Sequence, residues 1–408
     1  MNAMKDIIYK IKEYGLFISL YKIIHRVIIK TYSYIIKKIS KLDNNSIVFM
    51  SLPCFSDNSL AFSEYLLKKN YHNKYKIYWV VDNIDYYKNK YPNSKYIFIQ
   101  EKNKYNETTF KYTRIGLTSK FLFGTHWFAN EKSNSIKGQQ YILLWHGCSF
   151  KDKNSNNNER KFDIALVAGP IFKKTKSKFW NISEKYLLAK GYPRYNWLIN
   201  PSQKAYEYKD ILTNKYNKLI IWMPTFRNDK NGYYKETEKI TNFPLINNND
   251  EWKNLDIICK NNNIKLLIKL HPFQKSYNIK FDLFDNIIEI TNEDLKNRDI
   301  PLYELVGTTD ALITDYSSIA IDYLLINKPI AYTLDDFHLY KDMRGFVFDN
   351  PKSYMIGDHL YTINDLNNFI NKISCNIDTY ESSRNNLSNE LIYKSNDYCY
   401  ELLKELDL

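Results

Sequence analysis

The sequence has few cysteines, glycines and prolines, and it has no long uncharged apolar stretch. Its 408 residues include five cysteines, 11 glycines and 11 prolines. The cysteines are far apart and form no CxxC pair or zinc-ligand spacing, which excludes a small disulfide scaffold. Nowhere do about 18 uncharged apolar residues follow one another, and no apolar region precedes a signal-cleavage site. We therefore expect reduced cysteines, no spanning helix, no signal peptide and a cytoplasmic protein.

Four common catalytic signatures are also missing. The chain has no GxGxxG dinucleotide fingerprint, no Walker A loop, no GxSxG elbow and no HExxH helix. Dehydrogenase, P-loop ATPase, serine hydrolase and zinc protease functions therefore lose their usual support. The pair Asp335 and Asp336 is more typical of a solvated turn than of a metal site. We expect no metal centre and no cofactor.

Positive charge is in excess. Lys and Arg number 58 against 45 Asp and Glu, a net charge of +13. Such a balance favours anionic partners, namely phosphates, lipid surfaces or nucleic acid. No basic motif interleaved with aromatic residues is present, so we expect no nucleic-acid partner.

The first tenth of the chain is especially basic. Residues 1–41 contain nine Lys or Arg against Asp6 and Glu13, which gives +7. Apolar residues recur there at intervals of three, four or six residues, a pattern typical of helices with an apolar stripe beside a basic face. Such a segment can lie on an anionic bilayer. A helical hairpin that packs on the following domain is an equally compatible interpretation.

Beyond Lys41, short apolar runs alternate with helical stretches, as in βα units and parallel sheets. We predict an α/β protein with two Rossmann-like domains facing a cleft, residues 42–205 and 206–408, joined through a polar stretch at 200–217. The predicted strands are 46–52, 75–81, 96–99, 121–124, 141–145, 163–168, 186–189, 218–223, 264–269, 286–290, 311–314 and 329–332. The predicted helices are 57–69, 252–262, 317–326 and 363–372.

A histidine follows a predicted strand in each half of the chain. His146 comes directly after the run 141–145 and precedes Gly147, which allows a ligand or backbone to approach closely. His271 follows the run 264–269, and Pro272 restricts it to extended backbone. A strand-end histidine can act as a general base near neutral pH, although it is more often a structural hydrogen-bond donor. Because ligands bind beyond the carboxyl ends of parallel strands, the two histidines could converge in one cleft.

Three further features suit phosphate binding. Arg227 follows the strand 218–223, and Arg344 lies in a loop after the last strong strand; guanidinium groups bind phosphate bidentately, but each could be an ordinary surface arginine. Ser317 and Ser318 open a predicted helix, where N–H groups, hydroxyls and the helix dipole favour an anion. The alternative for these serines is a plain N-cap.

Taken together and in order, these runs resemble the CDP-glycerol glycerophosphotransferase family, which builds teichoic acids and related polyol-phosphate capsules. The runs are WHGCSFK (145–151), GYPRYNWL (191–198), MPTFR (223–227), KLHP (269–272), TDYSSIAIDYLLINKPIAY (314–332) and RGFVFD (344–349). The earlier FMSLPCFSDNSLAFSEYLL (49–67) is similar to the family's first βα unit. Each run alone is weakly specific, whereas the ordered set is highly specific.

The resemblance implies a GT-B fold in which residues 42–205 bind the acceptor and residues 206–408 bind a CDP-polyol donor, without a metal. It assigns His146 as the base and His271 as the contact to the donor pyrophosphate. It places Arg227, Ser317, Ser318 and Arg344 at positions expected to hold phosphate, and we expect Lys151, Thr314 and Asp315 to bind substrate as well. The implied reaction is attack of an acceptor hydroxyl on the donor β-phosphate, with release of CMP. With the basic N-terminal segment, it implies a peripheral enzyme on the inner face of the cytoplasmic membrane, acting on a lipid-linked or polysaccharide acceptor.

The chain departs from the family pattern in two places. Cys148, Ser149 and Phe150 replace the usual Thr-Pro-Leu after His-Gly, and Asn196 replaces the Asp that usually follows Pro-Arg. These changes leave the acceptor pocket and the polyol open, so CDP-ribitol or another CDP-polyol is an alternative donor. A GT-B glycosyltransferase that uses a nucleotide sugar and a non-enzymatic binder of anionic polymers are the remaining alternatives.

Overall fold

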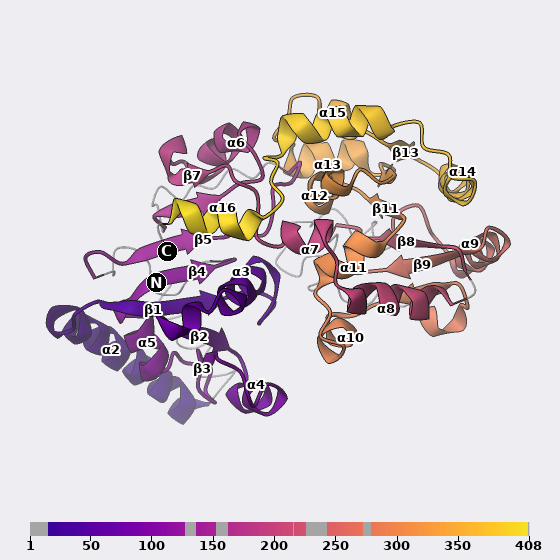
Figure 1. Ribbon diagram of the computed structural model, residues 1–408. Helices are drawn as coiled ribbons and strands as arrows, with labels where there is room; N and C mark the ends of the chain where they lie inside the picture. Colours follow the sequence, from indigo (N-terminus) through magenta and orange to yellow (C-terminus); the bar gives the residue numbers. More distant parts are fainter. Residues whose placement is uncertain are drawn as a thin grey trace. The chain divides into compact units, whose positions relative to one another are not determined.

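The computed structural model describes residues 15–126, 136–151, 162–214, 216–225, 243–271, 279–406 and 408. The chain divides into two compact units, Met1–His146 with Glu159–Ala165 and Gly147–Asn158 with Leu166–Leu408. Parallel strands with helices beside them form both units (Figure 1). The functional division expected at residue 205 stays a prediction. The polar stretch expected around it is not a linker, because helix α8 (Gln203–Thr213) lies within it.

The first sheet has the strand order β3-β2-β1-β4-β5-β6-β7. Its strands are β1 (Asp43–Met50), β2 (Lys76–Val81), β3 (Ile97–Gln100), β4 (Ser119–Gly124), β5 (Gln140–Leu143), β6 (Ile164–Leu166) and β7 (Leu187–Leu188). The central strand β1 buries Ile47, Val48 and Phe49 completely, which is why it reads as a continuous apolar run. The strands β1 to β4 are connected by the helices α3 (Asp57–Lys68), α4 (Ile84–Lys90) and α5 (Phe110–Thr118).

The second sheet has the strand order β10-β9-β8-β11-β12-β13. Its strands are β8 (Lys218–Trp222), β9 (Ile264–Ile268), β10 (Ile287–Glu289), β11 (Ala311–Thr314), β12 (Ile330–Thr333) and β13 (Asp358–Leu360). The helices of this unit are α6 (Ile171–Trp180), α7 (Tyr195–Ile199), α8, α9 (Asn249–Asn261), α10 (Asn292–Asn297), α11 (Leu302–Thr308), α12 (Ile319–Tyr323), α13 (Phe337–Arg344), α14 (Ile363–Ser374), α15 (Glu381–Leu391) and α16 (Tyr398–Glu405). Every predicted strand is present, and within the described residues β13 is the one strand that was not predicted.

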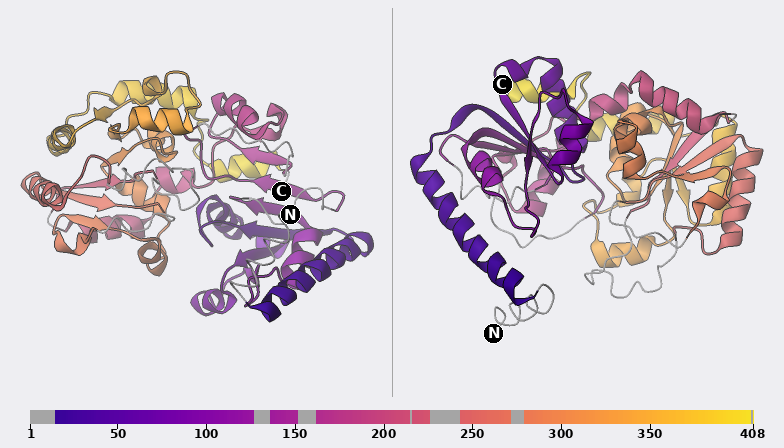
Figure 2. Two further views of the ribbon diagram at one scale, coloured as in Figure 1. Left: turned by 180° about the vertical axis from the view of Figure 1, so that it is seen from behind. Right: turned by 90° about the horizontal axis from the view of Figure 1, so that it is seen from below.

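The N-terminal segment contributes one long helix, α2 (Leu16–Ile39), which lies along the outer side of the first unit (Figure 2). It packs against α5, and Arg26 pairs with Glu107 at 2.8 Å. Only Ser19, His25 and Ile36 of this helix are buried. Residues 1–14 of the predicted basic segment lie outside the described residues.

Most of α2's apolar residues face away from the protein. Phe17 is 88% exposed and Val27 60% exposed. The exposed apolar residues of α2 are Leu16, Phe17, Ile18, Leu20, Tyr21, Ile23, Ile24, Val27, Ile28, Tyr34, Ile35 and Ile39. Because positions three, four and seven apart share a face of a helix, these residues include a continuous apolar stripe. Among the described helices, none combines the length and apolarity that crossing a bilayer requires.

Candidate active site

His146 lies three residues beyond the carboxyl end of β5. Its ring stacks on His126, with centroids 4.7 Å apart and planes 9° apart, and its Nδ1 lies 3.4 Å from the carbonyl oxygen of Thr125. Burial lowers the pKa of His126, so this neighbour is neutral near pH 7 and adds no positive charge beside His146. The half-buried imidazole of His146 is thus held in place by an aromatic neighbour and a carbonyl group.

The backbone on either side of His146 adopts unusual conformations. Trp145 has φ +57°, and Gly147 has φ +119°. A Cβ atom on Gly147 would lie 2.7 Å from Ser318 Cβ and Oγ and 2.9 Å from Arg194 Nη2. Only glycine fits here, since any larger residue would clash with these groups. The glycine of the WHG run therefore packs directly on the serine run that opens α12.

Cys148 is a packing residue in this structure. It is fully buried, its Sγ lies 3.2 Å from the Tyr192 hydroxyl, and burial raises the pKa of its thiol. A buried, protonated thiol is a poor nucleophile. Cys148 therefore contributes to packing and is not a candidate nucleophile.

The serine run forms a turn at the end of β11. Ser317 and Ser318 are half-buried, and the N-cap residue Ser318 makes no side-chain hydrogen bond to the N-terminus of α12. The capping interpretation is therefore not what the structure shows. Helix α12 has only five residues, so its dipole would add little to the binding of an anion at this turn.

Thr314 and Asp315 connect the ends of two neighbouring strands. The Thr314 hydroxyl donates to the Met223 carbonyl at 2.8 Å. The fully buried Asp315 carboxylate accepts from the N–H of Thr225 at 2.8 Å and also from its hydroxyl. Both side chains thus hold the turn at residues 223–225, which leads to Arg227. Arg227 itself lies outside the described residues.

Two positively charged residues that are far apart in the sequence, Lys151 and Arg344, lie on paired segments of the second unit. Lys151 pairs with Phe346 in an antiparallel bridge, and Val347 N donates to Phe150 O at 2.9 Å. This pairing brings the WHGCSFK run beside the loop after Arg344. The prediction that Arg344 lies in a loop is wrong, because Arg344 is the half-buried last residue of α13.

His271 lies within electrostatic range of Lys151 and Lys269. The residue as a whole is exposed, but the protein around its imidazole desolvates it, and Lys151 and Lys269 add positive charge; together these effects lower its pKa to about 4. The imidazole is therefore neutral at pH 7 in the absence of an anion. The buried Lys269, whose Nζ donates to Leu270 O at 3.0 Å, has a pKa lowered to about 8 by burial.

A buried ion pair lies behind Gly147. Arg194 Nη2 contacts Asp322 Oδ2 at 2.6 Å, and the hydroxyls of Tyr195 and Tyr303 donate to the same carboxylate at 2.5 Å each. Burial raises the pKa of the Asp322 carboxyl, and the Arg194 guanidinium opposes that shift. The sequence signal for this pair was an acidic residue inside the apolar run IAIDYLL, but its partner could not be read from spacing.

The second departure from the family pattern also has a structural explanation. Asn196 Nδ2 donates to Asp397 Oδ1 at 2.8 Å, and Asn196 Oδ1 accepts from the N–H of Tyr398 at 2.7 Å. An aspartate at position 196 would place a second carboxylate against Asp397, so asparagine suits this partner. Asn196 thus secures the start of α16.

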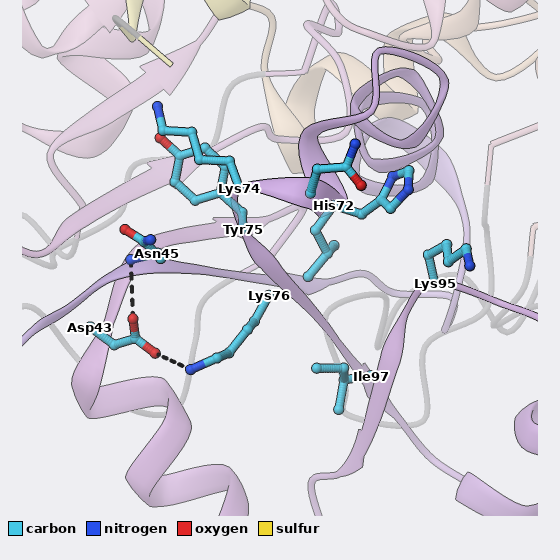
Figure 3. Close-up of a pocket in the computed structure, with 10 residues that line it drawn as sticks. Asp43, Asn45, His72, Lys74, Tyr75, Lys76, Lys95 and Ile97 are labelled. Atoms are coloured by element: carbon cyan, nitrogen blue, oxygen red, sulfur yellow. Dashed lines mark hydrogen bonds and ion pairs between the residues drawn. The ribbon is translucent and has the colours of Figure 1, made fainter.

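A cavity of about 460 Å³ lies at the opposite, amino edge of the first sheet (Figure 3). His72, Lys74 and Lys95 line it, and Lys76 pairs with Asp43 across it at 3.3 Å. Because His146 follows the carboxyl end of β5, this cavity is separate from the candidate active site. Within the described ranges, no three His, Cys, Asp or Glu side chains gather in a way that suits a metal ion.

Residues 32–398 match the family described as CDP-Glycerol:Poly(glycerophosphate) glycerophosphotransferase. The chain belongs to this family. The resemblance inferred from the ordered runs is therefore confirmed, and the family match extends beyond them at both ends.

Curated relatives and a solved structure agree with this assignment. A teichoic acid glycerol-phosphate primase of Bacillus subtilis (strain 168) is 27% identical over 306 residues, covering 69% of this chain and 72% of the relative. A teichoic acid poly(glycerol phosphate) polymerase of Staphylococcus epidermidis is 26% identical over 336 residues, covering 72% of this chain. The match spans only 40% of that polymerase's length.

The structure of the wall teichoic acid polymerase TagF superposes with a TM-score of 0.70, covering 96% of each chain at 19% identity. At this identity the similarity shows the fold. It confirms the predicted α/β fold of GT-B type, with an added N-terminal helix.

Proposed function

We propose that this glycerophosphotransferase-family protein transfers glycerol phosphate from CDP-glycerol to a hydroxyl group of a lipid-linked or polysaccharide acceptor in teichoic acid-like polymer synthesis. The acceptor hydroxyl attacks the β-phosphorus, the bond from that phosphorus to the bridging oxygen breaks, and CMP leaves with that oxygen. His146 takes the hydroxyl proton. The product is a phosphodiester.

The observation that carries this proposal is the convergence of the family's runs in the second unit. Gly147, directly after the candidate base, packs on Ser318. Lys151, His271 and Lys269 add hydrogen-bond donors and positive charge within electrostatic range of one another. A phosphoryl group needs in-line positioning and charge neutralisation, and side chains of these types provide both.

The decisive assay compares donors. Purified protein is incubated with CDP-glycerol, CDP-ribitol and a panel of nucleotide sugars together with a glycerol phosphate-primed acceptor. Mass spectrometry then measures CMP, nucleoside diphosphates and the extended acceptor. Release of CMP with an acceptor heavier by one glycerol phosphate supports the proposal. Release of a nucleoside diphosphate from a nucleotide sugar supports the glycosyltransferase alternative instead. Release of CMP from CDP-ribitol alone would show that the transferred group is ribitol phosphate.

Replacing His271 with alanine is expected to weaken CDP-glycerol binding about 10- to 150-fold, because a charge-assisted hydrogen bond is worth roughly 1.5–3 kcal/mol. The bound pyrophosphate favours the protonated imidazole, whose pKa is about 4 without it. Wild-type binding should therefore take up protons at about pH 5, where Lys269 is already charged, and this uptake should be lost in the His271→Ala variant, as measured by calorimetry in buffers of different ionisation enthalpy.

His359, on the edge strand β13, provides the matched control for this measurement. The His359→Gln variant should bind CDP-glycerol as the wild type does and show the same proton uptake. Equal donor affinity in the His271→Ala and His359→Gln variants would remove His271 from the donor site.

We propose further that α2 holds the enzyme on an anionic membrane surface, where a lipid-linked acceptor is available. The exposed apolar side chains of α2 lie away from its three buried residues, and Lys30, Lys37 and Lys38 add positive charge to the same helix. Apolar side chains and cations on one helix fit the boundary between acyl chains and anionic headgroups.

Replacing Phe17, Leu20 and Ile24 together with glutamine is expected to reduce binding to phosphatidylglycerol vesicles at least tenfold in a sedimentation assay. Burial of one such side chain contributes roughly 1.5–3 kcal/mol, and all three are exposed, so folding should be unaffected. Ile211 is similarly exposed on α8, and the Ile211→Gln variant is the matched control. Each cation near the surface should add about 1 kcal/mol to the free energy of membrane binding. Wild-type protein that does not bind these vesicles at low salt would therefore contradict the membrane role.

A further inference from the structure

Asn58 joins the first βα unit to the turn that carries His146. It is the second residue of α3 and is fully buried. Its Nδ2 donates to the carbonyl oxygen of Trp145 at 2.8 Å and lies 3.4 Å from that of Leu144. One side-chain amide thus reaches the carbonyl groups of the two residues that precede His146.

The turn needs such support because its conformation is costly. Trp145 has φ +57°, a conformation that costs a bulky non-glycine residue roughly 1 kcal/mol or more and persists only when its surroundings enforce it. Asn58 fixes the peptide groups on both sides of the Trp145 Cα atom. A second contact comes from the end of the neighbouring strand β4, where the carbonyl oxygen of Thr125 lies 3.4 Å from His146 Nδ1.

We propose that Asn58 is a positioning residue that sets the orientation of His146 for proton transfer. Without its amide, the carbonyl groups of Leu144 and Trp145 lose a buried donor, and Trp145 can relax to negative φ. A change of backbone direction at Trp145 displaces the next side chain, and a shift of about 1 Å in a catalytic group can cost 10²-fold in rate. The inference rests on the proposed role of His146 as the base.

The test compares Asn58→Ala with Ser63→Ala, a matched loss of polar contacts in the same helix. Ser63 is also fully buried, donates to Leu60 O at 3.0 Å and accepts from Trp79 Nε1 at 3.1 Å. Below the melting temperatures of both variants, Asn58→Ala should lower kcat about 10- to 100-fold with donor Kd within twofold of wild type. Ser63→Ala should keep kcat within twofold.

Asn58→Asp keeps the side-chain shape and tests the hydrogen bond itself. A carboxylate facing two carbonyl oxygens repels them, whereas a protonated carboxyl donates to them. The kcat of Asn58→Asp relative to wild type should therefore increase as pH falls, and this variant also serves if Asn58→Ala does not fold.

A second measurement does not depend on turnover. Carbethoxylation of His146 by diethyl pyrocarbonate, followed by peptide mass spectrometry, reports the environment of the imidazole. Its rate should change at least threefold in Asn58→Ala and not in Ser63→Ala. If the wild type releases no CMP, the proposed function fails while this rate still tests Asn58. Equal carbethoxylation rates in Asn58→Ala and wild type, or equal kcat values in Asn58→Ala and Ser63→Ala, overturn the inference.

Discussion

Replacing His146 with alanine is expected to lower kcat for glycerol phosphate transfer by about 10² to 10⁴-fold, the usual contribution of a general base. Donor affinity should stay within about twofold of wild type, because His146 is proposed to act on the acceptor proton and not on the pyrophosphate. Single-turnover CMP release measures the first quantity, and calorimetry with CDP-glycerol measures the second.

The neighbouring His126 offers a control of the same residue type. Its ring stacks on His146, but the depressed pKa caused by burial and its place behind His146 give it no proposed proton to transfer. His126→Phe retains an aromatic ring at this position and should lower kcat less than tenfold. A folded His146→Ala variant that retains more than a third of wild-type kcat would show that another group takes the proton.

The strand pattern could be predicted because the central strands are apolar on both faces. β1, β9 and β11 have buried centres, and their apolar runs stand out between polar helices. β13 was missed because Asp358, His359 and Leu360 form no apolar run at the edge of the sheet. Helix α8 was missed because, among Gln203–Thr213, only a few positions are buried, so polar residues dominate its sequence.

The candidate site divides in the same way. Strand-end residues such as His146 and Ser318 could be found from the sequence, because parallel strands place their carboxyl ends at one edge. The residues that support them could not be found in this way. Asn58 lies 88 residues before His146, and Arg194 lies 128 residues before Asp322. Such pairings depend on the route of the chain and leave no local spacing. For Thr314 and Asp315, the structure shows hydrogen bonds to residues 223–225 that spacing could not indicate.

Replacing Asp322 with alanine is expected to destabilise the second unit by roughly 3–5 kcal/mol, because it leaves the Arg194 charge buried without its counterion. Three side chains lose their acceptor at once, namely Arg194, Tyr195 and Tyr303. Urea unfolding followed by tryptophan fluorescence measures the shift in midpoint. The exposed pair of Asp250 and Lys253, 2.8 Å apart, gives the control, since Asp250→Asn should leave the midpoint unchanged.

The milder Asp322→Asn variant separates folding from function. It keeps an acceptor for the tyrosines but leaves the Arg194 charge uncompensated, so a smaller loss of stability is expected. Arg194 Nη2 lies against Gly147, and Gly147 packs on Ser318, so a displaced guanidinium should disturb the serine turn. CDP-glycerol binding by folded Asp322→Asn should therefore weaken several-fold. If this variant is destabilised but binds the donor as tightly as wild type, the ion pair supports only the fold, and the serine turn does not depend on it.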